Sequence, residues 1–497
     1  MKLKILILIS LFVAQPSFGE TIAGHGHLKE YLLKFHRDAQ GAMNRPTAEG
    51  AEPFYPIKYN PNNFFNDIGR EFRKLIMRDF MPYSQPAADD RVENLVEGTI
   101  LKNLLEIDRK GLKKSALETM PWSDSYWPMA RGLIGNRYAD PGFPDGYSWS
   151  ANRSYVASTP AAAMYASGRG GMLSPSEKYD LFVGDPGMAL TQSVWAKGQY
   201  YFDTYGMVES WMGLCHGWAP ASFMFAKPER AVEVTGVSGR RIRFYPSDIK
   251  AIASLLWGTT HVQPKFIGVK CKSRYPDYDE VGRITSENCT DTNAGTWHQA
   301  VVSQIGVNRR GLVMDATYNY EVWNHAIYSY EYVYFNPQTL EPTPHLNKAA
   351  VAMNRFTIDK FRKYRAPDAV SVVGVSMNLT YMVPIRSSHA EGQSNMTKTV
   401  NFVYDLELNA AGEIVGGEWY NNLHPDFLWT PAVGSRAISV GDNGIEPAEW
   451  SIDSPLPGHW AAAAQTASRR GQPLAAIVER LVEVTRAAPT VPVPGVQ

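Results

Sequence analysis

The hydrophobic pattern of this 497-residue chain changes its period once, and that change limits the folds open to it. Over 62–76 and 90–107 apolar residues recur every three or four positions, which predicts helices. From about Thr296 onward they alternate with polar residues, which predicts strands of an antiparallel sheet with one face in solvent. Helices followed by such a sheet indicate the α+β class.

The predicted strands begin at TWHQAVVSQIG, from Thr296, followed by a turn over 308–311 and a second strand, LVMDATYNYEVWN. SYEYVYF, VVGVSMNLTYMV and a hairpin around 409–412 continue the sheet, and an amphipathic helix is expected over 474–484. We divide the chain into a leader (1–19), a mostly helical region (20–140), a catalytic core (141–455) and a C-terminal helix with a tail (456–497).

The first nineteen residues have the pattern of a cleaved signal peptide. Lys2 and Lys4 precede an apolar run, and Ser17 and Gly19 supply the small residues that signal peptidase reads. No later apolar run reaches the roughly 18–20 residues of a membrane span. We therefore expect a secreted or periplasmic protein, in which 20–51 is a candidate cover for the active site before processing.

Composition excludes several classes of protein. With 44% hydrophobic and 20% charged residues the chain is neither disordered nor collagenous. Lysine and arginine balance aspartate and glutamate at 49 each, with no basic stripe, so nucleic acid is not an expected partner.

The expected export of the protein affects the interpretation of its three cysteines, because exported proteins commonly contain disulfides. Cys271 and Cys289 bracket a polar segment and are expected to form a disulfide in an oxidising compartment. Cys215 is then left as an odd thiol, which indicates either a reactive group or a small buried apolar residue.

Cys215 has a setting suited to a nucleophile. It lies in ESWMGLCHGWAPASFMF, at the expected start of a buried helix, where the helix dipole favours the thiolate. His298 and Asp315 are predicted on two neighbouring strands, so that the carboxylate orients the imidazole beside the thiol. The order Cys215, His298, Asp315 is similar to that of papain-like folds and their transglutaminase relatives. A packed histidine and a turn-capping aspartate are the structural alternatives.

The stretches WMGLCHGWAPAS, TWHQAVVSQIG, LVMDATYNYEVWN and GGEWYNNLHPDFLWTP make the resemblance more specific. With PWSDSYWP and SPSEKYDLFVGD upstream, the chain resembles the transglutaminase-elicitor family of oomycete cell walls and secreted bacterial proteins over about 65–450. The segment from Val322 matches the Val-Trp-Asn start of that family's elicitor peptide, but has Ala326 in place of its proline, and we interpret it as structural.

The resemblance implies an exported protein-glutamine γ-glutamyltransferase with a papain-like or transglutaminase-like cysteine core. Cys215 would be the nucleophile, His298 the general base and acid, and Asp315 the orienting carboxylate. The backbone N–H of Cys215 would stabilise the oxyanion, with the indole of Trp211 or Trp218 as a second donor. The expected partners are proteins that present glutamine and lysine side chains, or primary amines, including proteins of the cell envelope or wall.

The sequence is compatible with three other functions, of which two require the same triad and one does not. A glutamine deamidase or a papain-like thiol peptidase would need the same triad, and a wall-binding protein would not need Cys215 at all. No cofactor is expected, and Asp277, Asp279 and Glu280 form the one acidic group suited to Ca²⁺, unless they are a solvated loop. A second histidine–aspartate pair, His424 and Asp426, is expected to be structural.

Overall fold

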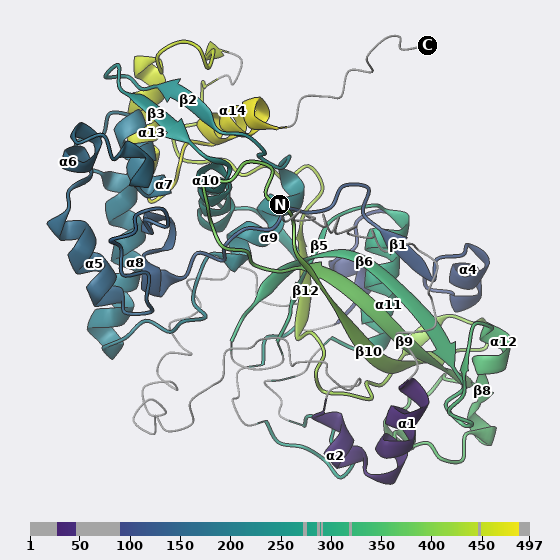
Figure 1. Cartoon of the computed structure of the whole chain (residues 1–497). Helices are drawn as coiled ribbons and strands as arrows, with labels where there is room; N and C mark the ends of the chain where they lie inside the picture. Colours follow the sequence, from purple (N-terminus) through teal and green to yellow (C-terminus); the bar gives the residue numbers. More distant parts are fainter. Residues whose placement is uncertain are drawn as a thin grey trace, which may run out of the picture.

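A curved antiparallel sheet organises one half of the molecule (Figure 1). Three strands of twelve residues form its centre, β6 (Asn324–Phe335), β9 (Ser371–Met382) and β10 (Thr397–Leu408). The sheet order is β11-β10-β9-β6-β5-β12-β4. The shorter strands are β11 (Ile414–Gly416), β5 (Leu312–Asp315), β12 (Phe427–Pro431), β4 (Pro264–Gly268), β1 (Lys114–Ala116), β7 (Pro342–Thr343) and β8 (Val351–Ala352).

This computed structural model describes residues 27–45, 90–271, 276–285, 289, 292–317, 321–445 and 449–486. The predicted leader (1–19) and the predicted helix over 62–76 lie outside these residues. Within them, the α+β class is confirmed, and so is the presence of strands in the predicted segments from Leu312 onward, including the hairpin after Leu408.

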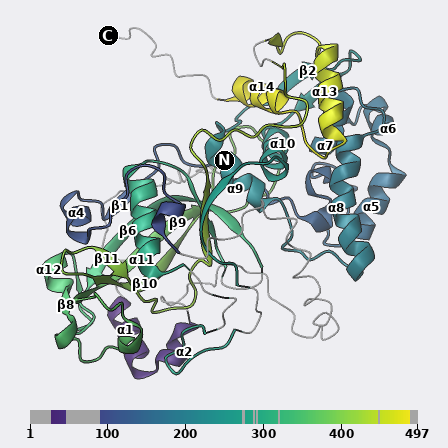
Figure 2. The same cartoon turned by 180° about the vertical axis from the view of Figure 1, so that it is seen from behind.

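Helices gather in a second lobe beside the sheet, and α9 (Cys215–Met224) lies between the two lobes (Figures 1 and 2). Two C-terminal helices belong to this lobe, since α13 packs on α8 and α14 packs on α10. The helix predicted over 474–484 is thus confirmed, while α13 was not foreseen. The lobe consists of α5 (Trp149–Ser158), α6 (Ala161–Ala166), α7 (Pro175–Phe182), α8 (Ala189–Tyr205), α10 (Pro246–Thr259), α13 (Gly458–Ser468) and α14 (Ala475–Thr485), with the hairpin β2 (Val232–Thr235) and β3 (Arg241–Phe244).

Two predicted elements are wrong. The long helix over 90–107 is instead a short 3-10 turn, an irregular segment and α4 (Leu104–Arg109), which Asn103 caps. Gly98, with φ of 118°, interrupts the helical pattern. The segment from Thr296 is helical too: α11 (Ala294–Val301) continues as a π-helical turn to Val307, and α11 packs against β10 and β11. The side chain of Asn293 caps α11, accepting a hydrogen bond from the backbone of Gly295.

The first described helices, α1 (Leu28–Arg37) and α2 (Ala39–Met43), pack at the end of the sheet where β6 finishes. Phe35 packs on Tyr420 with ring centroids 4.6 Å apart, and Tyr31 donates a 2.6 Å hydrogen bond to the carbonyl of Tyr420. Both helices share a buried cluster with Phe335, the last residue of β6. They therefore cover the end of the sheet opposite the start of β6, where Cys215 makes its contacts.

The predicted disulfide between Cys271 and Cys289 is present. It ties the segment that follows β4 to the segment that precedes α11, and the backbone N–H of Cys271 donates a 2.8 Å hydrogen bond to the carboxylate of Asp426. No helix in the described residues combines the length and the apolar character that crossing a membrane requires.

We expect the double variant Cys271→Ser/Cys289→Ser to fold with a lower free energy of unfolding, because the open chain gains entropy. Loop closure over the separation of 18 residues corresponds to a loss of about 3 kcal/mol. Urea unfolding, followed by tryptophan fluorescence, measures the difference. Wild-type protein unfolded with reductant should give the midpoint of the variant, and an unchanged midpoint in both would contradict a stabilising role.

Candidate active site

Cys215 is the first residue of α9, as the sequence predicted for a nucleophile. Its side chain is buried and it is the free cysteine of the chain. The thiol lies 3.6 Å from the carbonyl of Val322, and Nδ2 of Asn324 donates to Sγ at 3.7 Å. Burial raises the pKa of the thiol, whereas the hydrogen bonds from Asn324 and the helix N-terminus act in the opposite direction.

Asp315 ends β5 and pairs across the sheet with Asn324, the first residue of β6. Its Oδ1 accepts hydrogen bonds from the backbone of Trp323 at 2.8 Å and from the hydroxyl of Thr317 at 2.9 Å. Its Oδ2 is buried and has no hydrogen-bond partner in the described part of the chain. Burial raises the pKa of Asp315 to about 7, and the charge of this carboxylate acts on the Cys215 thiol. Thiol and carboxylate therefore share one buried site.

Asn324 is a site residue that sequence reasoning assigned only to structure. Its Oδ1 accepts a 2.7 Å hydrogen bond from the indole of Trp429 in β12, which orients Nδ2 toward the sulfur. Val322, Trp323 and Asn324 thus all contact Cys215 or Asp315. The Val-Trp-Asn segment forms a wall of the site.

The predicted triad is not brought together, because His298 lies elsewhere. It sits in α11 rather than on a strand, its Nδ1 is 2.8 Å from the hydroxyl of Tyr404, and its ring packs on Tyr332 at 4.9 Å. Tyr332 comes eight residues after Asn324 in β6, a separation of about 26 Å along a strand. Burial lowers the pKa of His298 to about 3, so the neutral ring belongs to the apolar core. This geometry gives no support to His298 as the base.

The two predicted oxyanion donors also point elsewhere. The indole N–H of Trp218 donates to the carbonyl of Trp122 at 3.0 Å, and that of Trp211 donates to the carboxylate of Glu209 at 2.5 Å. The donors beside the sulfur are instead the amide of Asn324 and the backbone N–H groups at the start of α9.

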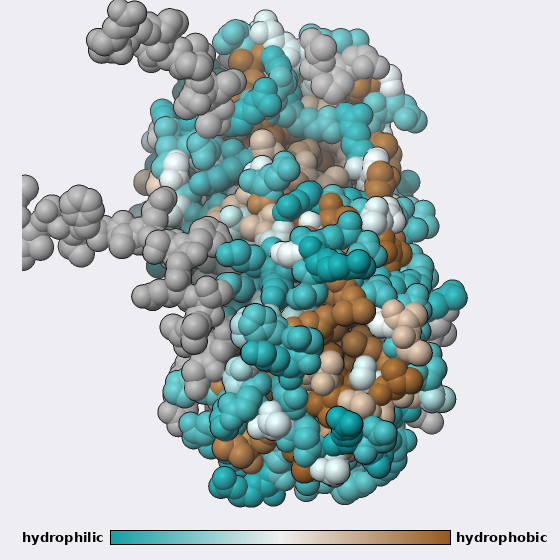
Figure 3. Space-filling model, turned by 90° about the vertical axis from the view of Figure 1, so that its right-hand side faces the viewer, coloured by the Kyte–Doolittle hydropathy of each residue, from teal (hydrophilic) through white to brown (hydrophobic). Residues whose placement is uncertain are grey.

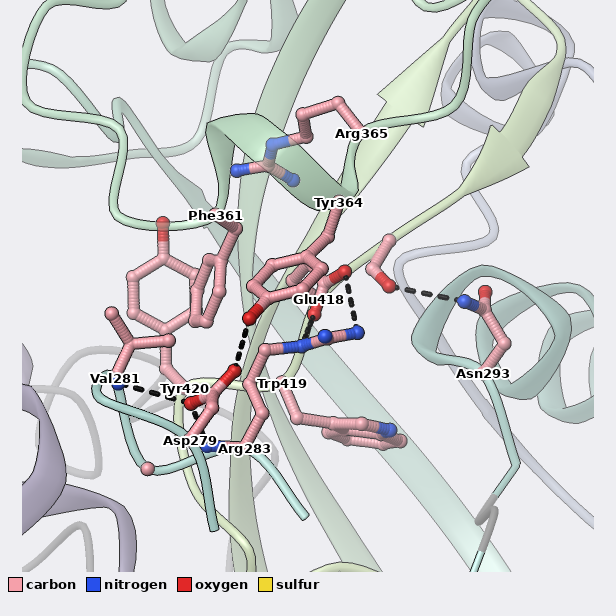
Figure 4. A network of polar contacts seen from close by, with 12 residues as sticks. Asp279, Val281, Arg283, Asn293, Phe361, Tyr364, Arg365, Glu418, Trp419 and Tyr420 are labelled. Atoms are coloured by element: carbon pink, nitrogen blue, oxygen red, sulfur yellow. Dashed lines mark hydrogen bonds and ion pairs between the residues drawn. The ribbon is translucent and has the colours of Figure 1, made fainter. Parts of the chain in front are cut away.

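The acidic loop considered for Ca²⁺ is occupied by protein contacts (Figure 4). Oδ1 of Asp279 accepts the backbone N–H groups of Val281 and Arg283, and its Oδ2 accepts the hydroxyl of Tyr364. Glu280 pairs with Lys363. Over the described ranges no three of the residue types His, Cys, Asp and Glu are grouped to hold a metal ion.

The second histidine–aspartate pair has structural contacts, as expected. His424 stacks on Trp419 with ring centroids 4.4 Å apart, and Asp426 accepts the backbone of Cys271.

A cavity of about 500 Å³ lies at the other end of the sheet from Cys215. Its lining includes Ser371, which starts β9, and Leu408, which ends β10, together with the exposed side chains of Leu105 and Val370. Apolar side chains gather on the lower part of the face shown in Figure 3. Neither Cys215 nor Asp315 lines this cavity, so it is separate from the candidate active site.

Comparison with known families identifies the chain. The family model described as "Transglutaminase elicitor" matches residues 95–452. The chain belongs to the transglutaminase-elicitor family. Among solved structures it is similar to the GP42 transglutaminase from Phytophthora sojae, at 20% identity and a TM-score of 0.47, over 69% of this chain and 89% of that one. A similarity at that level carries no argument about residues. No curated protein matches the chain.

We expect Asp315→Asn to stabilise the protein increasingly as the pH rises from 5 to 8. The folded state raises the pKa of Asp315 to about 7, above its usual value near 4, so folding favours the protonated form. That stability is complete at low pH and is lost as the carboxyl ionises, whereas asparagine stays neutral. The melting temperature of the variant minus that of wild type should grow across this range. A difference independent of pH would show that Asp315 ionises normally.

Proposed function

We propose that this protein is an exported protein-glutamine γ-glutamyltransferase that works through a thioester on Cys215. The observation that carries the proposal is the buried thiol at the start of α9, contacted by the Asn324 amide and acted on by the charge of Asp315. Membership of the transglutaminase-elicitor family supports acyl transfer as the chemistry of this site.

In the proposed first step, the ionised Asp315 takes the proton of the Cys215 thiol, and the sulfur attacks the carboxamide carbon of a substrate glutamine. The Asn324 amide and the N-terminal N–H groups of α9 stabilise the oxyanion. Asp315 then returns the proton to the departing nitrogen. Ammonia leaves, and the acyl group remains on sulfur as a thioester.

In the second step a primary amine attacks the thioester carbonyl and the carbon–sulfur bond breaks. The product is an amide, which is an isopeptide cross-link when the amine is a lysine side chain. If water attacks instead, glutamate is formed and the protein is a glutamine deamidase. Both outcomes use the same residues in the first step, so the acceptor alone distinguishes them.

Export is supported by two features. The Cys271–Cys289 disulfide is of the kind that persists in oxidising compartments, and the leader predicted over 1–19 provides the route. The proposed partners are envelope or wall proteins with accessible glutamine and lysine side chains.

We expect residues 20–497 to incorporate a fluorescent primary amine into casein, and Cys215→Ala to incorporate none. Cys215→Ser, which keeps the size of the side chain, is the matched control for folding, and both variants should keep the wild-type melting temperature within a few degrees. Ammonia release without labelling would identify a deamidase, and fragmentation of casein would identify a peptidase. Equal labelling by the alanine variant, or no Cys215-dependent reaction with or without Ca²⁺, would reject the proposal.

We expect the rate of thioester formation to rise with pH through an apparent pKa near 7, because Asp315 must be ionised to accept the thiol proton. Ammonia release from a glutaminyl peptide, measured between pH 5 and 9, gives this profile. Asp315→Asn should lower kcat/KM by at least about 100-fold and remove the acid limb. Asp426→Asn serves as the control on a neighbouring carboxylate and should retain the limb. A wild-type rate that is flat between pH 5 and 8 would eliminate Asp315 as the base.

A further inference from the structure

The thiol of Cys215 is closed off from solvent. Cys215 is 4% exposed, so a substrate carboxamide reaches the sulfur only when a neighbouring group moves. The helices α1 and α2, which belong to the segment expected to cover the active site, lie at the other end of the sheet. Among the described residues, those that close the route to the thiol therefore belong to its own surroundings.

An irregular segment over 121–128 runs beside the residues that lead into α9. The backbone N–H of Leu214 donates a 2.7 Å hydrogen bond to the carbonyl of Tyr126. A Cβ atom on Gly213 would lie 2.4 Å from that carbonyl oxygen and 2.8 Å from Cδ2 of the Tyr126 ring. The ring of Tyr126 thus lies against the backbone two residues before Cys215.

The same ring packs on the opposite wall of the site. Its centroid lies 5.0 Å from that of Trp323, and the two rings meet edge to face. Trp323 is the residue whose backbone N–H donates to Oδ1 of Asp315, directly before β6. Tyr126 therefore bridges the residues before α9 and those before β6, the two elements that meet at the sulfur.

Two hydrogen bonds fix the hydroxyl of Tyr126. It donates a 2.9 Å hydrogen bond to the carbonyl of Ser210, and it lies 3.0 Å from the hydroxyl of Tyr147. A tyrosine hydroxyl has one proton, so Tyr147 is the donor in the second contact. Tyr147 is 47% exposed and precedes α5, and the guanidinium of Arg131 lies 4.5 Å from its ring centroid. The hydrogen bond that ties Tyr126 to this loop is thus at the surface.

Trp127 fixes the backbone from which the Tyr126 side chain projects. Its φ of 47° is a left-handed conformation that bulky residues rarely adopt. The indole donates a 2.8 Å hydrogen bond to the buried carboxylate of Asp124, and the backbone N–H donates to Oγ of Ser125 at 3.0 Å. Strain that surrounding contacts maintain in this way is typical of functional sites. These contacts hold the backbone and leave the Tyr126 side chain as the part that can move.

The other described neighbours of the thiol are held by regular structure. Asn324 is paired with Asp315 across the sheet, and its movement would break the ladder between β6 and β5. On the other side α9 packs on α10 so closely that a Cβ atom on Gly217 would lie 2.1 Å from the carbonyl oxygen of Ser254. Displacement of Tyr126 breaks only side-chain contacts, and it is therefore the movement that costs least.

We propose that the Tyr126 side chain is the gate of the Cys215 thiol and that the hydrogen bond from Tyr147 holds it closed. When that hydrogen bond breaks, the ring leaves Trp323 and Gly213, and the sulfur becomes accessible. The backbone of Tyr126 keeps its hydrogen bond to Leu214 throughout. This gate controls access for any substrate of the thiol, so it goes beyond the proposed acyl transfer and does not depend on it.

The test measures how fast iodoacetamide alkylates Cys215, the free cysteine of the chain, by mass spectrometry of intact protein at pH 8. Tyr147→Phe keeps the ring and removes the donor, and we expect it to raise the alkylation rate about fivefold, because the closed form loses one hydrogen bond. Tyr126→Phe loses both hydrogen bonds and should raise the rate at least as much.

The matched control is Tyr165→Phe. Tyr165 lies on α6, away from α9 (Figure 1), and its hydroxyl donates a 3.1 Å hydrogen bond to the carbonyl of Arg241. This variant also loses one tyrosine hydrogen bond, and its alkylation rate should stay within twofold of wild type. Melting temperatures of all variants should stay within a few degrees of wild type, which separates opening of the gate from unfolding.

The outcomes do not depend on any substrate, so a failure of amine incorporation would leave this test intact. Faster alkylation of both gate variants, with the control at the wild-type rate, supports the gate. Rates within twofold of wild type for Tyr147→Phe and Tyr126→Phe, or an equal gain in Tyr165→Phe, would reject it. A wild-type thiol alkylated as fast as in urea-unfolded protein would also reject it. If Tyr126→Phe does not fold, the comparison of Tyr147→Phe with Tyr165→Phe decides alone.

Discussion

The hydrogen bond from the backbone of Trp323 to Oδ1 of Asp315 is the contact on which the site depends. It joins the end of β5 to the residue before β6, so that Asp315 and Asn324 face each other as a pair across the sheet. Oδ1 accepts hydrogen bonds from the backbone of Trp323 and from the hydroxyl of Thr317. Oδ2 has no hydrogen-bond partner among the described residues and is the oxygen proposed to accept the thiol proton. The start of α9 then places a thiol against the same pair, and the indole of Trp429 fixes the amide that touches the sulfur.

Burial of Asp315 costs free energy of folding when the carboxyl group is ionised, and it also sets the pKa of that group. Burial of a carboxylate disfavours its ionised form, and the pKa of Asp315 rises to about 7. The hydrogen bonds of Trp323 and Thr317 and the charge of Lys270 limit that rise. A base that ionises near neutral pH can both accept and return a proton, which a carboxyl group at its usual pKa does poorly. The same burial that lowers the stability of the folded protein when Asp315 is ionised therefore gives Asp315 the pKa that its proposed role as a base requires.

The parts of the site that sequence predicted are those fixed by local chemistry. Cys215 at a helix start, Asp315 at a strand end and the Cys271–Cys289 disulfide follow from neighbouring residues and from the compartment. His298 was misplaced because the β-branched residues that follow it resemble a strand, whereas the Asn293 cap and burial in the core favour a helix. Asn324 was missed as a site residue because its role depends on pairing with β5, which no local pattern encodes. The indoles of Trp211 and Trp218 were likewise assigned by proximity to Cys215 in sequence, whereas Trp218 donates to Trp122, 96 residues away, and Trp211 donates to its near neighbour Glu209.

The described residues place no histidine against the Cys215 thiol, so in the proposed reaction the electrostatics of the buried site take the part that an imidazolium has in a triad. Lys270 comes directly before the disulfide-bonded Cys271 and two residues after the end of β4, so these elements fix its backbone. Nζ of Lys270 lies 5.7 Å from the ring centroid of Trp211, and the positive charge of Lys270 lowers the pKa of Asp315, against the effect of burial.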